Sequence, residues 1–127
     1  MKESNIQQLI RLEASNHGTT LFRINVGTGV TGNGQIRHKD GSVTVKNARP
    51  FSTGVPRGYS DLSGVKTVTV TSDMVGKKIG VAVFAEVKTD TGRIRDEQEK
   101  FLSVMKGKGA IAGIVRSVDD FVKLVND

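Results

Sequence analysis

The stretch "IGVAVFAEVK" (Ile79–Lys88) is the longest near-continuous apolar run of the chain and decides its fold class. Its valine content favours a strand in the middle of a sheet. Gly92 then breaks the chain, and apolar spacing predicts a helix from about Arg95 to Lys108. A second apolar run predicts a strand over Ala110–Arg116. This β-α-β order predicts two parallel strands with a right-handed crossover.

The sequence on either side of this unit predicts further helices and strands. A helix is expected from Ser4 to about Asn16, with Gln7 completing a capping box on Ser4, and Ser117 is expected to cap a last helix. Strands are expected over Leu21–Val26, Ser42–Lys46 and Ser60–Ser72, the last one bent at Gly64. The predicted order is α-β-β-β-β-α-β-α in one domain over residues 1–127: an α/β fold with a mixed sheet flanked by helices.

The segment Gly27–Gly58 differs in composition from the rest of the chain: it is rich in Gly, Thr and Asn and poor in apolar residues. A stretch this long without its own core is usually functional or mobile. It carries five cations against the single acid Asp40: Arg37, Lys39, Lys46, Arg49 and Arg57. The segment is either a solvent-exposed loop without a binding role or a binding surface for a polyanion.

Composition narrows the classes of function. The 127 residues hold 19 Lys and Arg against 13 Asp and Glu, a net charge of +6, so a nucleic-acid partner and an incidentally basic protein are both open. The absence of cysteine excludes disulfides and thiolate metal sites. The longest apolar run is too short for a bilayer, and the N-terminus does not resemble a signal peptide. We therefore expect an intracellular, cytoplasmic protein with no membrane partner.

Two charges interrupt an apolar face at the end of the first strand. Side chains alternate along a strand, so Glu86 and Lys88 extend the face of Ala82 and Phe84. One explanation is that the strand emerges into solvent there. The other is a polar cleft, because an uncompensated buried charge costs several kcal/mol (~2 or more).

Two helices each place a polar residue on an apolar face. Glu13 follows Leu9 by four residues, and Gln98 precedes Phe101 by three. Taken singly, each could lie at the edge of the core. Together with the strand end, they favour a shared cleft.

Asp61 is the remaining candidate, in "RGYSDLSG" where a Gly-rich loop enters a strand. It could form an Asx-turn. Alternatively, Asp61 and Glu86 from neighbouring strands, with a backbone carbonyl, would form a hard-oxygen site suited to Mg²⁺ or Mn²⁺. Asp73 is a competing acid, but it sits in a turn signal.

Four motifs in this order resemble the VRR-NUC domain, a branch of the PD-(D/E)xK nuclease superfamily: "GYSDLxG", "FAEVK", "GRIxxEQxxFL" and "GxIAGIVRSxDD". The resemblance covers roughly Gly58 to Asp120, with a weaker similarity at Glu13 and "LFRINVGTG". It departs at Ser60, where the superfamily has Pro, and in the long interval from Asp61 to Glu86. It implies a restriction-endonuclease-like mixed sheet between helices.

The resemblance also implies metal-dependent hydrolysis of phosphodiester bonds. Asp61 and Glu86 would bind Mg²⁺ or Mn²⁺ with the carbonyl of Val87, and Glu13 would reach the metal directly or through water. Lys88 would hold or activate the attacking water or stabilise negative charge. Gln98 would orient Lys88 or a phosphate. The DNA backbone would be met by Arg23, Arg37, Lys39, Arg49 and Arg57.

The implied partner is branched or flapped DNA, such as a Holliday junction, in a phage- or bacterium-encoded protein. A homodimer would place two active sites across a junction, and a monomer acting on flaps is the alternative. A non-catalytic nucleic-acid-binding module and a restriction-type enzyme compete with this interpretation. The isolated His17 and His38 lack metal spacing, and "GTGVTGNG" lacks the ending of a P-loop.

Overall fold

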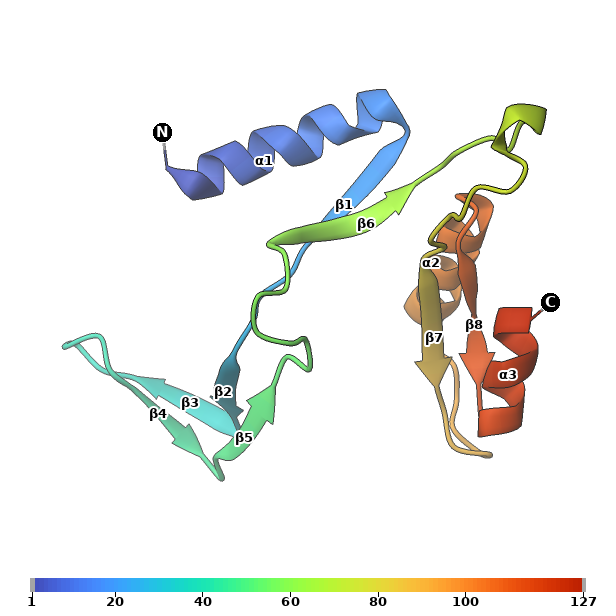
Figure 1. Ribbon diagram of the computed structural model, residues 1–127. Coiled ribbons are helices and arrows are strands. Elements are labelled where there is room, and N and C mark those ends of the chain that lie inside the picture. The colour runs from blue at the N-terminus through green and yellow to red at the C-terminus, as the bar shows by residue number, and fades with distance from the viewer. Residues whose placement is uncertain (1, 127) are drawn as a thin grey trace. The chain divides into compact units, whose positions relative to one another are not determined.

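The computed structural model describes residues 2–126 and divides the chain into two compact units (Figure 1). Unit 1 holds the chain up to Phe22 and again from Gly64, and unit 2 is Arg23–Ser63. The strands β1 (Thr19–Arg23) and β6 (Leu62–Lys66) form one two-stranded sheet. At its two ends the Ile24 N–H donates to the Asp61 carbonyl and the Thr67 N–H to the Gly18 carbonyl, each at 2.9 Å. Residue numbers rise along β1 as they fall along β6 between these two bonds, so the strands are antiparallel.

The β-α-β unit predicted from the sequence is present in unit 1. It consists of β7 (Val83–Val87), α2 (Asp96–Gly107) and β8 (Ile111–Val115). The strands pair in parallel, with Glu86 opposite Ile114, which confirms the predicted direction. Within residues 2–126, β7 pairs with β8 alone, so the predicted position in the middle of a sheet is wrong, and the strand is shorter than the expected Ile79–Lys88.

The core of unit 1 lies between these strands, α2 and β6. Its buried residues are Val65, Leu102, Met105, Ala110 and Ala112. The rings of Phe22 and Phe84 pack against this cluster, and the ring of Phe101 contacts both of them, with centroids 5.5 to 6.5 Å apart. Edge-to-face ring packing of this kind adds to the free energy gained from buried apolar area.

The helix ends confirm one predicted cap and correct another. Helix α3 (Val118–Asn126) is capped by Ser117, whose Oγ accepts the Asp120 N–H at 3.1 Å. Helix α1 (Glu3–Ala14) begins one residue before Ser4, without a side-chain cap, so the predicted capping box is wrong. The acidic Glu3 in the first turn compensates electrostatically for the missing cap. The short 3-10 turns are η1 (Ser15–His17) and η2 (Ser72–Met74).

Unit 2 is more regular than the sequence predicted. It holds two antiparallel ladders, β2 with β5 and β3 with β4, and only β4 was expected. Each strand has four residues, too few for alternation to stand out. No side chain within Arg23–Ser63 is fully buried. The bounds are β2 (Thr28–Thr31), β3 (Gly34–Arg37), β4 (Val43–Lys46) and β5 (Arg49–Ser52).

The predicted restriction-endonuclease-like sheet is not formed among residues 2–126. The described residues form three helices and eight strands, and the strands pair into separate two-stranded sheets. Of the strand expected over Ser60–Ser72, β6 covers only Leu62–Lys66, and Val68–Val81 belongs to no ladder. A cavity of about 250 Å³ lies there, and its lining includes Val68, Val70 and Val81. Among residues 2–126, no helix is long and apolar enough to cross a membrane.

The turn between β3 and β4 gives a direct test of the unit 2 fold. Asp40 Oδ1 accepts the Ser42 Oγ–H at 2.6 Å and the Ser42 N–H at 2.9 Å. These two hydrogen bonds hold the pKa of Asp40 below its ordinary value, and the bond from the Ser42 hydroxyl contributes most. A lowered carboxyl pKa stabilises the turn above the unfolded-state pKa, and this contribution is lost as pH falls through the folded-state pKa.

We predict that Ser42→Ala raises the pKa of Asp40 toward its ordinary value, because the strongest hydrogen bond to the carboxylate is removed. A pH titration of the Asp40 carboxyl carbon by NMR measures the shift. Ser52→Ala, in the same unit but away from Asp40, is the control. An unchanged Asp40 titration in Ser42→Ala would show that the turn does not form as described.

Candidate active site

Strand β7 separates its side chains into two faces, as the sequence predicted. The side chains of Ala82, Phe84, Glu86 and Lys88 are half-buried, whereas the alternate residues from Val81 to Val87 are exposed. Phe84 packs against Phe101 of α2, which places α2 over the first face. The two charged residues therefore continue the face that packs against this helix.

Glu86, Lys88 and Gln98 meet at a single oxygen atom. Gln98 Nε2 donates a hydrogen bond to Glu86 Oε1 at 2.8 Å, and Lys88 Nζ lies 3.6 Å from the same Oε1. The Lys88 side chain is only 16% exposed and that of Glu86 33%. Lys88 is thus held against Glu86 rather than extended into solvent. The structure brings together three of the five residues predicted to be catalytic.

The start of α2 fixes the orientation of Gln98. The Arg95 N–H donates to Gln98 Oε1 at 3.1 Å, so the amide oxygen is committed to the helix N-terminus. The amide nitrogen must then face the other way, toward Glu86. Both ends of the amide are satisfied, which makes Gln98 a rigid support for the carboxylate. A small cavity of about 190 Å³ adjoins it, lined by Phe84, Ala85, Glu86, Gln98, Phe101 and Leu102.

Arg116, the residue after β8, supports the same site, and the sequence analysis did not predict this role. Its Nη1 donates to the carbonyls of Thr89 and Gly92, the latter at 3.0 Å. Its own backbone N–H donates to Asp120 Oδ2 at 2.9 Å. The turn held in this way directly follows Lys88, whose N–H donates to the Val115 carbonyl at 3.0 Å. The sequence contains the motif "RSxDD", but no sequence pattern predicts its contact with a turn 24 residues earlier.

The oxygen atoms around Glu86 fit part of a site for a hard cation. Both polar contacts of its side chain go to Oε1, so within residues 2–126 Oε2 makes none. The bonds from Lys88 N–H to Val115 and from Ile111 N–H to Ala82 show that even-numbered residues of β7 face β8. The Val87 carbonyl therefore points to the opposite, unpaired edge. One carboxylate oxygen and one carbonyl are available for Mg²⁺ or Mn²⁺.

The predicted ligand Asp61 and the competing acid Asp73 belong to other elements than β7 and α2. Asp61 belongs to unit 2, where its carbonyl accepts the Ile24 N–H, and its pairing with Glu86 stays a prediction. Asp73 lies in η2, and the Thr71 hydroxyl donates to its side chain, as the turn signal suggested. Across residues 2–126, no three His, Cys, Asp or Glu side chains gather as a ready metal cluster.

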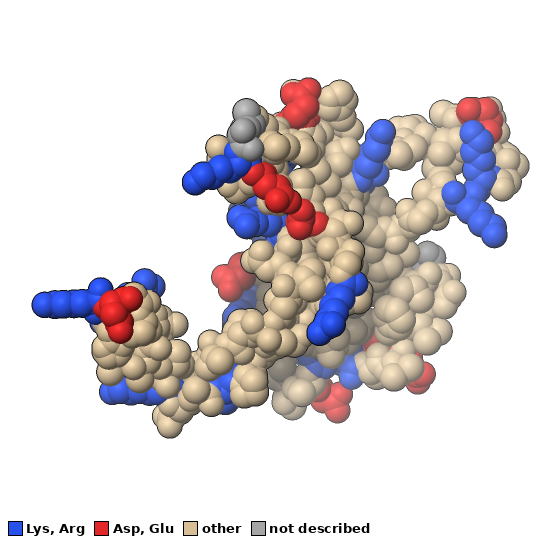
Figure 2. All heavy atoms as spheres, turned by 60° about the vertical axis from the view of Figure 1, so that its left-hand side comes forward, with Lys and Arg blue, Asp and Glu red and all other residues tan. Residues whose placement is uncertain are grey.

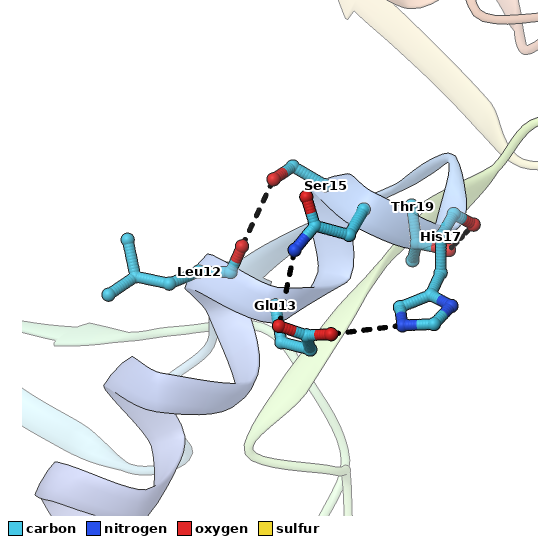
Figure 3. A network of polar contacts seen from close by, with 6 residues as sticks. Leu12, Glu13, Ser15, His17 and Thr19 are labelled. Atoms are coloured by element: carbon cyan, nitrogen blue, oxygen red, sulfur yellow. Dashed lines mark hydrogen bonds and ion pairs between the residues drawn. The ribbon is translucent and has the colours of Figure 1, made fainter.

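Glu13 is engaged at the end of its own helix (Figure 3). Its Oε1 lies 3.2 Å from His17 Nε2, and its Oε2 accepts a hydrogen bond from Asn16 Nδ2 at 3.2 Å. Its side chain is 66% exposed. The structure therefore does not place Glu13 with Glu86, and its role at a metal stays a prediction. The i,i+4 spacing of Glu13 and His17 would have revealed this local pair.

Most of the net charge is carried by unit 2. Arg23–Ser63 holds six Lys and Arg against two Asp, a net charge of +4 out of +6 for the chain. On the face shown in Figure 2, basic side chains project at several separate places and are interspersed with acidic ones. All five residues predicted to contact DNA are exposed members of unit 2: Arg23, Arg37, Lys39, Arg49 and Arg57.

Comparison of the chain with protein-family models, with curated proteins and with solved structures gives no match. The resemblance to VRR-NUC domains therefore rests on the four motifs alone.

We predict that Arg116→Ala destabilises unit 1 by about 1–3 kcal/mol, because two carbonyl groups lose a charged donor. Urea unfolding measures the loss. Hydrogen exchange should also quicken at the Lys88 amide and in the turn from Thr89 to Gly92. Arg93→Ala, an exposed residue of the same connection, is the control. Parent-like unfolding of Arg116→Ala would contradict the assigned support.

Proposed function

We propose that the chain is a divalent-metal-dependent deoxyribonuclease, an endonuclease selective for branched DNA. The observation that carries this proposal is the convergence of Lys88 and Gln98 on one oxygen of Glu86, which leaves the second oxygen available. A lysine beside a carboxylate at a strand end is what the motif "FAEVK" implies by its resemblance to the PD-(D/E)xK nucleases. The side-chain contacts join Glu86 and Lys88 of this motif to Gln98 of the motif "GRIxxEQxxFL".

The chain's own groups have separate tasks in this proposal. Glu86 Oε2, the Val87 carbonyl and Asp61 would hold the cation, and Glu13 would contribute directly or through water. A bound Mg²⁺ or Mn²⁺ would lower the pKa of water and stabilise charge on the phosphate. The Lys88 ammonium would donate hydrogen bonds to the attacking water or to a phosphate oxygen. Gln98 keeps Glu86 Oε1 occupied, so that Oε2 alone faces the cation.

The proposal requires Asp61 to approach Glu86 from a neighbouring strand. The unpaired edge of β7, which carries the Val87 carbonyl, is the place where such a strand would lie. The stretch Thr67–Val70 alternates Thr and Val, as a strand of a sheet does. We propose that β6 and β7 lengthen toward each other in the active form, which would build the restriction-endonuclease-like sheet.

Unit 2 is the proposed DNA-binding surface. Its two-stranded ladders have no core of their own, and such ladders are marginally stable in water. A polyanion would supply the missing contacts to its cations. Contacts with the DNA backbone give affinity without sequence information, which suits an enzyme that selects DNA shape. A homodimer with two such sites would match the symmetry of a four-way junction.

A non-catalytic nucleic-acid-binding module is the second candidate function. The observation that favours it is the absence of a ready three-residue metal cluster from residues 2–126. Such a module would keep the basic unit 2 and would use the Glu86, Lys88 and Gln98 contacts only to stabilise unit 1. The two candidates predict the same DNA binding and differ in cleavage.

The test is a cleavage assay with four-way junction, flap and linear duplex DNA, each with Mg²⁺, Mn²⁺ or EDTA. We expect the junction or flap to be cut with metal and not with EDTA. Lys88→Ala should cut at least about a hundredfold more slowly, because it removes a group placed at the developing charge. Lys100→Ala, an exposed lysine of α2, is the matched control and should cut like the parent.

Two outcomes would overturn the proposal. Binding without cleavage in both metals would favour the non-catalytic module. Parent-like cleavage by Lys88→Ala would show that the active site lies elsewhere. Light scattering of the free protein tests the homodimer separately.

A further inference from the structure

The β2–β5 ladder of unit 2 places an aromatic ring and a cation on one face. Gly29 pairs with Phe51 and Thr31 pairs with Arg49. Directly opposed side chains of an antiparallel ladder share a face, and so do residues two apart on one strand. Arg49 and Phe51 therefore stand on the same face, about 7 Å apart along β5.

The ring of Phe51 lies across the backbone of Gly29. A side-chain carbon added at Gly29 would stand only 2.7 Å from the Cε1 and Cζ atoms of Phe51. Glycine is thus the residue that lets the ring lie down on β2. The ring is nevertheless 47% exposed and lines a shallow hollow of about 660 Å³.

Phe51 is not a core residue of unit 2, since no side chain within Arg23–Ser63 is fully buried. The unit leaves the ring uncovered while carrying a net charge of +4. That charge favours a polyanionic occupant over an apolar peptide. Single-stranded nucleic acids are bound by this combination, in which cations follow the backbone and aromatic rings stack on bases.

We propose that Phe51 and Arg49 form a binding site for one nucleotide of an unpaired DNA strand. The base stacks on the exposed part of the Phe51 ring, and Arg49 contacts the neighbouring phosphate. A base inside a duplex cannot reach the ring, so the site distinguishes unpaired from paired DNA. This inference rests on the proposed function only in taking DNA as the partner, and it would supply the preference for flaps and branches.

The test measures binding in EDTA, where no metal-dependent cleavage occurs. The probes are a labelled single-stranded oligothymidine, the same strand with one 2-aminopurine, and a blunt duplex of equal length. Fluorescence anisotropy gives the affinity, and quenching of 2-aminopurine reports stacking. We expect quenching by the parent protein. We expect Phe51→Leu, which keeps an apolar side chain, to bind the single strand about tenfold to a hundredfold more weakly.

Matched variants separate stacking from charge and from folding. Phe51→Trp should retain the affinity and the quenching, which shows that an aromatic ring is what matters. Arg49→Ala should weaken both DNA forms and reduce the dependence of affinity on salt. Val43→Ala, at an exposed apolar residue of the other ladder, is the control and should change neither.

Three results would overturn the inference. The first is that Phe51→Leu binds single strands as well as the parent. The second is that it loses duplex affinity to the same degree as single-strand affinity. The third is that it leaves the quenching of 2-aminopurine unchanged. A failure here leaves the cleavage assay intact, because that assay depends on Lys88. Conversely, a chain that never cuts DNA but needs Phe51 for single strands would sustain this site and refute the nuclease.

Discussion

The parallel pairing of β7 with β8 is the constraint on which unit 1 depends. Parallel neighbours cannot be joined by a tight turn, so the chain has to cross over, and α2 is that crossover. The helix packs on the half-buried face of β7 through Phe84 and Phe101. This packing fixes which end of α2 lies beside Glu86, and it is the end that carries Gln98. The polar cluster is thus a consequence of the topology.

Hydrogen bonds from neighbouring residues restrain the side chains of the Glu86, Lys88 and Gln98 cluster. The N-terminus of α2 holds the oxygen of the Gln98 amide, and the nitrogen of that amide holds Glu86. Arg116, at the end of β8, holds the turn that follows Lys88. Each member is placed by a backbone group as well as by a side chain. Such preorganisation is what electrostatic catalysis requires, because the groups need not reorganise when charge develops.

The sequence predicted this half of the protein well because its signals are strong. The near-continuous apolar run Ile79–Lys88 and the helical spacing after Arg95 predicted the strand and the crossover helix, although one face of that strand is exposed. The ladders of unit 2 escaped notice because strands such as Thr28–Thr31 are short and bury little. The contact of Glu13 with His17 was missed because the helical face was judged by Leu9 and Ile10, both of which are exposed. Arg116 was missed because its partners are backbone carbonyls distant in sequence.

The central proposal is that Glu86 Oε2, the Val87 carbonyl and Asp61 would together hold a divalent cation. Mn²⁺ is paramagnetic and broadens the NMR signals of nearby nuclei, so a titration of the isotope-labelled protein locates the ion. The account predicts that signals of Glu86, Val87 and Asp61 broaden together at low Mn²⁺, and that Glu86→Gln abolishes all three effects. Broadening confined to other acidic residues, such as Asp119 and Asp120, with Glu86 and Asp61 unaffected, would contradict it.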